Sequence, residues 1–274
     1  MKIAVVGFGW LGFPLGKELL KKGNTVVGTT TSLDKIQVLK EAGLEPIVLN
    51  TDDDFPQNTT DFFANTAICI LNVPPGRRSN AEGMEQDIEN YGNRMVRIAN
   101  LFPIETRFVF VSSTGVYPNE IGVAIEDEFD RTQYLSTNSL AFAEEALHQL
   151  LGNRLTVLRL SGLVGGERQM GKYFAGRKDI PNGDSPVNLI HQKDCIRLIQ
   201  RIIETESWGE IYNGTASEHP TRETCYTAYC RDHNLALPEF LDEENQVIGK
   251  LIDNQKSKEK LNFEYSYDNP LKMS

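Results

Sequence analysis

The chain has 274 residues and a formal net charge of -10 at pH 7. This length allows one large α/β domain, or one domain with a smaller appendage, and in either case a sizeable buried core. The dispersed negative charge argues against nucleic-acid and anionic-membrane partners, and no segment is long enough to cross a bilayer.

Short apolar runs alternate with helix patterns from the N-terminus onward. The runs expected to form strands cover residues 3–6, 25–28, 46–49, 67–73, 107–113 and 155–160. Helices are expected to end near residues 22 and 42, and to cover 84–101 and 139–151. This alternation predicts an α/β fold with a Rossmann-type, doubly wound parallel sheet, which binds ligands at the carboxyl ends of its strands. The first apolar run continues into a helix pattern rather than a signal-peptide cleavage site, so cytoplasm is the expected compartment.

A glycine-rich turn joins the first strand to the first helix and reads Gly7-Phe8-Gly9-Trp10-Leu11-Gly12. In this position the first glycine permits the tight turn, and the second lets the backbone approach a pyrophosphate. The third lets the helix pack closely on the strand. The motif therefore predicts a dinucleotide-binding loop, although a glycine turn that only packs a helix on a strand remains the alternative.

The end of the second strand carries hydroxyls in place of the carboxylate that binds the ribose 2′-hydroxyl of NAD. The sequence there reads Thr29-Thr30-Thr31-Ser32, and Asp34 and Lys35 follow. Hydroxyls and a lysine suit a 2′-phosphate, so Thr30, Thr31 and Ser32 are expected to bind NADP in preference to NAD. Ser32 could also cap the next helix, a role that is compatible with the first.

Two further strands end in polar or turn-forming residues. Asn72, Val73 and Pro74 close the fourth strand, where backbone and small side chains can border the cofactor. The fifth ends in "VFVSSTGVYP", which includes Ser112 and Ser113.

This last stretch resembles the strand-five segment of the extended short-chain dehydrogenase/reductase superfamily, in its epimerase and dehydratase branch. Three later segments agree in order: "VLRLSGLVGGERQ", "VNLIHQKDCIRLI" and "GEIYNGTASEHPTRETCY". The resemblance covers nearly the whole chain. It implies that Ser113 polarises the substrate oxygen and that Ser112 lies against the cofactor.

The resemblance departs from its pattern at the acid–base pair. The family carries Tyr-x-x-x-Lys-x-x-Ala-Glu on the next helix. When the Ala-Glu of this chain is aligned with the Ala-Glu of that pattern, Ser136 falls at the tyrosine position and Leu140 at the lysine position. Tyr117 and Tyr134 are the remaining catalytic candidates, but each would need a cation nearby, because a phenol of ordinary pKa is a poor base at neutral pH. The candidates for that cation are Arg159, Arg168 and Lys172. In these departures the chain resembles the atypical members of the superfamily.

From about residue 163 the alternation becomes irregular. We expect residues 1–162 to form an NAD(P)-binding Rossmann domain and residues 163–274 a small substrate-side lobe interwoven with it. A helix over 192–204 and a strand over 210–213 are expected in the second half. Arg177, Asn188 and His191 are cleft residues by analogy, although the sequence favours His191 as a packed residue that caps the helix carrying Asp194.

The cysteine spacing matches neither a disulfide framework nor a zinc motif. His219 and His233 flank Cys225 and Cys230, which leaves a metal site conceivable, but no metal is expected. The helices at 84–101 and 139–151 suit a homodimer interface, as in the extended members, and equally suit packing on the sheet.

Two functions remain open. The first is an NAD(P)-binding oxidoreductase or epimerase/dehydratase-like enzyme that acts on a small hydroxy or carbonyl substrate, with Ser113 as hydrogen-bond donor. The second is a catalytically degenerate NAD(P)-binding regulator or redox sensor. A fold of the β-hydroxyacid dehydrogenase type is disfavoured by the hydroxyl-rich end of the fifth strand.

Overall fold

The computed structural model describes residues 1–51, 53–76, 84–242 and 249–273. Seven strands form one sheet in the order β3-β2-β1-β4-β5-β7-β10. Their bounds are β1 (Lys2–Val6), β2 (Thr25–Thr30), β3 (Glu45–Val48), β4 (Ile68–Leu71), β5 (Arg107–Ser113), β7 (Leu155–Leu160) and β10 (Ile211–Gly214). The four pairs from β3 to β5 are parallel, and the strand order reverses direction at β1. The predicted doubly wound sheet is therefore confirmed.

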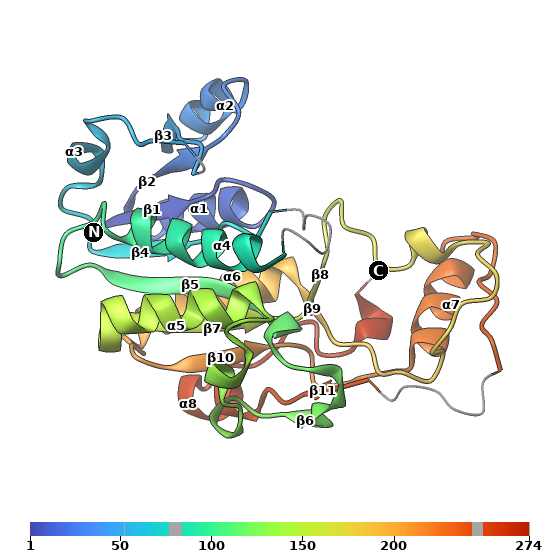
Figure 1. Ribbon diagram of the computed structural model, residues 1–274. Helices are drawn as coiled ribbons and strands as arrows, with labels where there is room; N and C mark the ends of the chain where they lie inside the picture. The colour runs from blue at the N-terminus through green and yellow to red at the C-terminus, as the bar shows by residue number, and fades with distance from the viewer. Residues whose placement is uncertain (52, 77–83, 243–248, 274) are drawn as a thin grey trace. The chain divides into compact units, whose positions relative to one another are not determined.

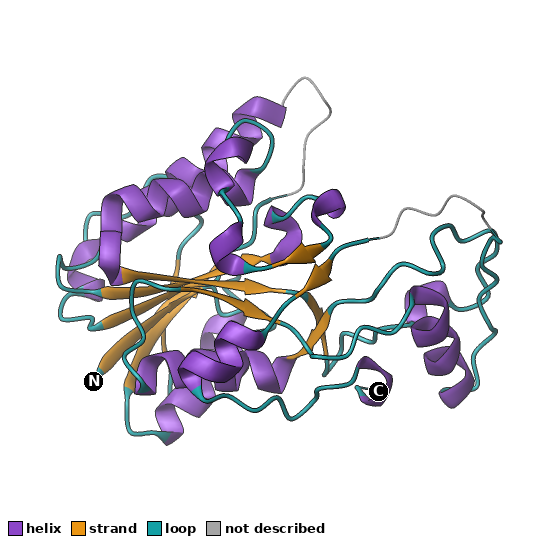
Figure 2. Ribbon diagram, turned by 90° about the horizontal axis from the view of Figure 1, so that it is seen from below, coloured by secondary structure: helices purple, strands orange, loops and turns teal. Residues whose placement is uncertain are grey.

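Helices lie on both faces of this sheet (Figure 2). Their bounds are α1 (Gly12–Lys21), α2 (Lys35–Glu41), α3 (Thr59–Phe63), α4 (Met84–Ala99) and α5 (Ser139–Leu151). A further helix, α6, covers Gln192–Glu204. The bounds of α5 and α6 are those that the sequence predicts, and α4 ends two residues early. The short helix α3 was not expected, because five residues are too few to show a helical period.

The α4–α5 face of the sheet holds a large hydrophobic core, and the two helices run side by side in front of the strands (Figure 1). Alternate residues of the strands point into it, as Phe108 and Phe110 do from β5. Met95 of α4 is fully buried against them. The helices approach closely at Gly92, where a Cβ would lie 2.2 Å from the Phe142 ring. A side chain at that position would separate the helices.

The chain divides into two compact units whose segments alternate in sequence. The first unit comprises residues 1–116, 130–158 and 202–211, and the second comprises 117–129, 159–201 and 212–274. The second unit adds β6 (Val123–Ala124) paired with β11 (Leu251–Ile252), β8 (Gly162–Val164) paired with β9 (Leu189–His191), α7 (Arg222–Asp232) and α8 (Gln255–Leu261). It has its own hydrophobic cluster around Val164, Leu189 and Cys225.

All four cysteines are buried and unbridged. The Cys225 sulfur lies 3.4 Å from that of Met170, and the Cys230 sulfur lies 3.8 Å from the Gly171 carbonyl oxygen. No group of three or more metal-binding side chains occurs among the described residues. Within the same residues, no helix is long and apolar enough to cross a membrane.

Candidate functional site

A pocket of about 200 Å³ lies in the first unit, at the carboxyl ends of β1 to β4. Its lining residues are Gly7, Phe8, Gly9, Thr29, Thr30, Thr31, Lys35, Leu49, Thr51, Asn72, Val73 and Pro74. The glycine turn, the hydroxyls after β2 and the end of β4 are thus brought together, as the sequence predicts. A ligand site at this edge is what a doubly wound sheet provides.

The three glycines of the turn occupy three different environments. Gly7 has φ +107°, and a Cβ there would lie 2.6 Å from the Asn72 carbonyl oxygen. No atom lies within 4 Å of the position that a Cβ would take on Gly9. At Gly12 a Cβ would lie 2.1 Å from the Gly7 carbonyl oxygen. These are a tight turn, an open approach and a close helix–strand contact, in the order that the motif predicts.

Side chains from β2 and β4 fix this turn. The Thr29 hydroxyl accepts a hydrogen bond from the Gly7 N–H at 3.0 Å, and its carbonyl accepts from the Phe8 N–H at 2.7 Å. Asn72 Nδ2 donates to the Gly7 carbonyl at 3.1 Å. No side chain caps the N-terminus of α1, so its partial positive charge faces the end of the turn. The arrangement suits an anion.

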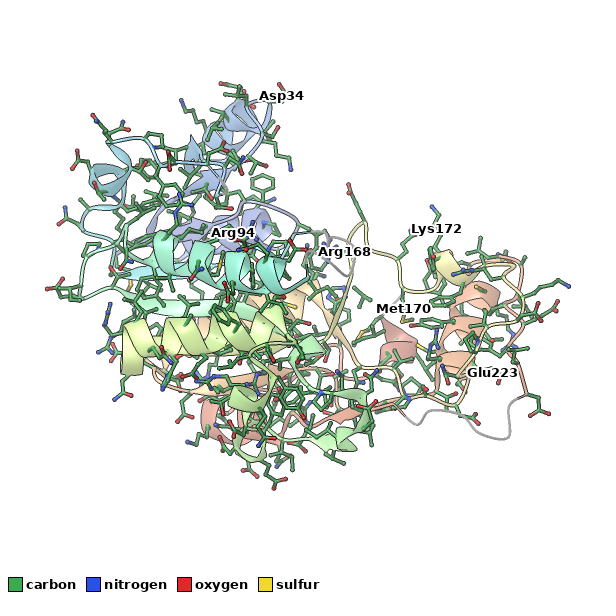
Figure 3. All side chains as sticks on the ribbon, viewed as in Figure 1. Asp34, Arg94, Arg168, Met170, Lys172 and Glu223 are labelled. Atoms are coloured by element: carbon green, nitrogen blue, oxygen red, sulfur yellow. The ribbon has the colours of Figure 1, made fainter. Side chains whose placement is uncertain are left out.

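Two residues of α4 hold the opposite wall of the pocket. The Tyr91 hydroxyl donates to the Val73 carbonyl at 2.8 Å, and Arg94 Nη2 donates to the Pro74 carbonyl at 3.4 Å. Arg94 also lies over the Tyr91 ring and is labelled on α4 in Figure 3. Sequence reasoning missed both, although their i, i+3 spacing puts them on one face of the helix that follows β4.

The end of β2 supplies the remaining wall. Thr30, Thr31 and Lys35 line the pocket, and none of the described lining residues is acidic. Ser32 does not cap α2 with its side chain, since that helix begins at Lys35 with Asp34 as an N-cap that makes no side-chain hydrogen bond. The Ser32 N–H instead donates to the Thr30 hydroxyl at 3.2 Å.

Five of the predicted cofactor residues lie outside this lining: Trp10, Leu11, Gly12, Ser32 and Ser112. The first three form the turn and the start of α1. Sequence reasoning had not named Leu49 and Thr51, which follow β3. The rule that ligands bind at the carboxyl ends of strands would have found them.

The two serines of β5 have different partners. The Ser112 hydroxyl donates to the buried Glu144 carboxylate of α5 at 2.6 Å, and this contact ties strand to helix. Ser113 is half-buried at the end of the strand, and its oxygen accepts from the Gly115 N–H at 3.1 Å. Within the described chain, the Ser113 hydroxyl makes no further hydrogen bond, so its proton can be donated to a ligand.

Asn138 anchors the start of α5. Its side-chain oxygen accepts from the Leu140 and Ala141 N–H groups, and its Nδ2 donates to the Gly115 carbonyl at 3.0 Å. Leu140, at the family's lysine position, packs against the hydrophobic core. Tyr134 lies in the short 3₁₀ turn Arg131–Tyr134 that precedes the helix, in the same unit as Ser113.

Tyr117 lies in the second unit and is almost completely buried. Its hydroxyl accepts from Arg159 Nη1 and donates to Asn213 Oδ1, both at 2.8 Å. Arg159 therefore supplies the cation that the sequence lacks near this tyrosine. Burial outweighs the guanidinium, however, and raises the pKa of Tyr117 to about 12. The phenol keeps its proton, and the geometry fits a structural role.

The Ile-His-x-x-Asp segment holds the C-terminal part of the chain. His191 Nδ1 accepts from the Lys193 N–H at 3.2 Å and so caps α6, as the sequence favours. Its ring stacks on Tyr267 with centroids 3.7 Å apart. The buried Asp194 carboxylate accepts from the Ser266 and Tyr267 N–H groups at 3.1 and 2.8 Å.

The other two residues named by analogy make local contacts. Asn188 bonds the backbone on both sides of the start of β11, through the Lys250 carbonyl and the Ile252 N–H. Arg177 lies over the Tyr173 ring at 4.5 Å.

Comparison with known proteins identifies the family. No family model matches the chain. The Escherichia coli K12 protein YeeZ is 34% identical to it over 275 residues, which cover 99% of this chain and 98% of YeeZ.

Two solved structures share the fold. The UDP-glucuronic acid 4-epimerase of Bacillus cereus, in complex with UDP-glucuronic acid and NAD, aligns with TM-score 0.76 at 18% identity, over 100% of this chain and 97% of that one. A short-chain dehydrogenase/reductase superfamily protein of Agrobacterium tumefaciens with bound NAD aligns with TM-score 0.74 at 16% identity, over 99% and 95%. The chain belongs to the family of YeeZ and has the fold of the short-chain dehydrogenase/reductase superfamily.

Proposed function

We propose that this protein binds NADP at the pocket of the first unit and acts as an oxidoreductase or epimerase on a small hydroxy or carbonyl compound. The observation that carries the proposal is the pocket itself, in which an open glycine turn, threonine hydroxyls and Lys35 come together without an acidic side chain among its described lining residues.

The residues present fit a dinucleotide. The pyrophosphate would lie against Gly9, beside which no atom lies within 4 Å of a Cβ position, and next to the uncapped N-terminus of α1. Val73 and Pro74, held by Tyr91 and Arg94, would border the other side. Two of the solved structures that share this fold contain NAD.

The end of β2 favours NADP over NAD. A carboxylate there would accept the ribose 2′-hydroxyl and repel a 2′-phosphate. Thr30, Thr31 and Lys35 instead offer hydroxyl donors and a positive charge. A charge-assisted hydrogen bond from Lys35 would therefore discriminate in favour of the phosphate.

Ser113 is the residue that we assign to the substrate. When bound, the nicotinamide supplies or accepts a hydride. The Ser113 hydroxyl, which takes a hydrogen bond from the Gly115 N–H, would donate its proton to the substrate oxygen on which negative charge develops. Tyr134 is the tyrosine that we retain as a proton donor, because the Tyr117 proton is already bonded to Asn213.

A second function, a nucleotide-binding regulator or redox sensor, is favoured by one observation. Leu140 packs against the core at the position where the short-chain dehydrogenase/reductase pattern has its lysine. This function requires binding that depends on the oxidation state of the cofactor, and no turnover. Any substrate-dependent change in cofactor absorbance would argue against it.

The first experiment is a parallel titration with NADPH and NADH, followed by tryptophan fluorescence. Trp10 lies in the glycine turn, and replacing Trp208, the other tryptophan, with Phe isolates its signal. We expect NADPH to bind about tenfold more tightly than NADH, because a hydrogen bond to a charged group contributes about 1.5–3 kcal/mol and about 1.4 kcal/mol gives a factor of ten.

Lys35→Glu should abolish that preference. Lys40→Glu, on the same helix but outside the pocket lining, is the matched control and should leave it unchanged. Equal affinity for the two cofactors in the wild type, or an unaltered preference in Lys35→Glu, would remove the NADP assignment.

The four unbridged cysteines fit a reducing compartment, so we place the protein in the cytoplasm.

A further inference from the structure

Gly115 lies in the short 3₁₀ turn Thr114–Val116, directly after β5, and both of its backbone polar groups are hydrogen-bonded. Its N–H donates to the Ser113 hydroxyl oxygen at 3.1 Å, and its carbonyl accepts from Asn138 Nδ2 at 3.0 Å. Gly115 therefore links Asn138, at the start of α5, to the serine that we assign to the substrate. Ser113, Gly115 and Asn138 all belong to the first unit.

The orientation of the Asn138 side-chain amide follows from its partners. Its Oδ1 lies 3.0 and 3.3 Å from the N–H groups of Leu140 and Ala141, and an N–H can only donate. Its Nδ2 lies 3.0 and 3.4 Å from the carbonyl oxygens of Gly115 and Val116, and a carbonyl can only accept. A flipped amide would put donor against donor and acceptor against acceptor. The oxygen thus serves the helix and the nitrogen serves the turn.

The turn needs this restraint at Gly115. Glycine has no Cβ, so its backbone has a wider range of conformations than that of any other residue. Gly115 is exposed, whereas Thr114 and Val116 on either side of it are buried. Packing therefore fixes the neighbours, and the Asn138 amide restrains Gly115 itself.

The direction of the Gly115 N–H matters for the Ser113 hydroxyl. A serine hydroxyl rotates unless a partner holds it, and here the N–H engages the oxygen and leaves the proton available. A donor that is oriented before the reaction needs no reorganisation when charge develops on the substrate oxygen. Displacement of such a group by about 1 Å can lower the rate by about 10²-fold.

The backbone of Asn138 makes a contact that is independent of the side chain. Its N–H donates to the Tyr134 carbonyl at 2.9 Å, and Tyr134 is the tyrosine that we retain as a proton donor. Substitution of the side chain leaves this hydrogen bond possible. The contribution of the amide nitrogen can therefore be measured by itself.

We propose that Asn138 is a positioning residue, which holds the Gly115 backbone so that the Ser113 hydroxyl is oriented toward the substrate oxygen. This inference rests on the proposed function, because it gives Asn138 no contact of its own with substrate or cofactor. Asn138 acts through Gly115 on Ser113, and its capping of α5 is a separate role that uses the other atom of the amide.

Asn138→Asp separates the two roles. Aspartate caps a helix as well as asparagine does, and its charge is favourable at a helix N-terminus. It has no N–H for the Gly115 carbonyl, so α5 stays capped and the turn loses its anchor. Asn138→Ser also keeps a capping oxygen without an amide, adds no charge, and carries the test if the aspartate variant does not fold. Asn153→Asp is the matched control, because Asn153 is exposed in the turn Gly152–Arg154 at the other end of α5.

The first readout needs no substrate. In ¹H–¹⁵N correlation spectra of the full chain, the Gly115 resonance is the glycine signal that Gly115→Ala removes. An alanine Cβ there would lie 3.4 Å from Ser113 Oγ and 3.6 Å from Leu140 Cδ1, which are ordinary contacts, so this variant should fold. Ser113→Ala removes the acceptor and should shift the Gly115 amide proton upfield. Both Asn138 variants should shift it in the same direction, and Asn153→Asp should leave it in place.

The second readout is NADPH oxidation with glyceraldehyde, a small hydroxy carbonyl compound. Asn138→Asp should lower kcat about tenfold to 10²-fold and leave KM nearly unchanged, because the lost interaction is made in the transition state. Added to Ser113→Ala, it should cause no further loss, since the two residues act as a unit. A residue that only capped α5 would leave kcat unchanged in Asn138→Asp. Asn153→Asp should keep the wild-type kcat.

Three results would overturn the proposal: an unmoved Gly115 resonance in both Asn138 variants, an undiminished kcat in both, or a further loss of kcat when Asn138→Asp is added to Ser113→Ala. If the wild type oxidises no NADPH with glyceraldehyde, the proposed function fails with this compound. The Gly115 resonance then decides by itself whether Asn138 positions Ser113, so the two failures are distinguished.

Discussion

The glycine turn offers two substitutions with opposite expected effects. In Gly12→Ala the new Cβ would lie 2.1 Å from the Gly7 carbonyl oxygen and 3.0 Å from Val5 Cγ1. The carbonyl cannot move freely, because it accepts a hydrogen bond from Asn72 Nδ2 at 3.1 Å. Either α1 shifts away from β1 or this hydrogen bond breaks. In Gly9→Ala the methyl group meets no atom within 4 Å.

These contacts set the size of the expected changes in the free energy of unfolding. Overpacking costs about 1–3 kcal/mol and the hydrogen bond about 1 kcal/mol, while alanine regains about 1 kcal/mol of helix propensity. Gly12→Ala should therefore lower the free energy of unfolding by about 1–3 kcal/mol, and each kcal/mol should lower Tm by about 2–4 °C. Gly9→Ala should leave stability unchanged or raise it by up to about 1 kcal/mol, because the unfolded chain loses freedom.

Urea unfolding and NADPH titration, both followed by tryptophan fluorescence, measure the two effects separately. Gly9→Ala should unfold at the same urea concentration as the wild type or a higher one, and it should bind NADPH more weakly, since its methyl group occupies the approach of the pyrophosphate. The reasoning fails if Gly12→Ala is as stable as the wild type, or if Gly9→Ala binds NADPH with undiminished affinity.

Four further predictions concern three hydroxyls and one buried carboxyl. Ser113→Ala should reduce turnover on the order of 10²-fold, as loss of a positioned donor does, whereas Ser112→Ala should destabilise the fold by about 1–3 kcal/mol, because it removes a hydrogen bond to the buried Glu144 carboxylate. Tyr117→Phe should also cost about 1–3 kcal/mol in urea unfolding and leave turnover unchanged. Burial raises the pKa of Glu126 above 4.5, so the folded state binds this proton more tightly than the unfolded state does. Stability is therefore lost as pH rises from about 4.5 through the folded pKa, and Glu126→Gln should gain stability over the wild type across that window.

Each of these predictions has an outcome that would contradict it. An unchanged free energy of unfolding in Ser112→Ala would show that its hydrogen bond to Glu144 does not stabilise the fold. Undiminished turnover in Ser113→Ala would take that serine out of the mechanism. A large loss of turnover in a stable Tyr117→Phe would restore Tyr117 as a catalytic residue. Parallel pH–stability curves for Glu126→Gln and the wild type would show that Glu126 is not the group responsible.

Much of the first unit was predictable because its signals are local. The alternation of apolar runs and helix periods specifies the sheet, and α5 begins and ends at the predicted residues. The glycine turn, the threonines after β2 and the end of β4 were assigned to one pocket, because parallel strands end at one edge of a sheet. Tyr91 and Arg94 were missed, because their contacts to Val73 and Pro74 depend on how α4 packs.

The use of each hydroxyl was decided only by the tertiary structure. Ser112 and Ser113 are neighbours in sequence, yet one bonds buried Glu144 and the other has its hydroxyl proton available to a ligand. Tyr117 meets Arg159 from 42 residues away and Asn213 from 96 residues away. Because such partners are distant in the chain and burial then sets the pKa, no motif could assign this tyrosine.

By itself, the sequence determined the doubly wound sheet and the glycine turn, since strand period, helix period and glycine backbone freedom are properties of neighbouring residues. The tertiary structure decided which side chains meet from separate segments, as His191 and Tyr267 do in their ring stack. The stack and the hydrogen bonds that Asp194 accepts from the Ser266 and Tyr267 N–H groups exist only when these segments are packed together.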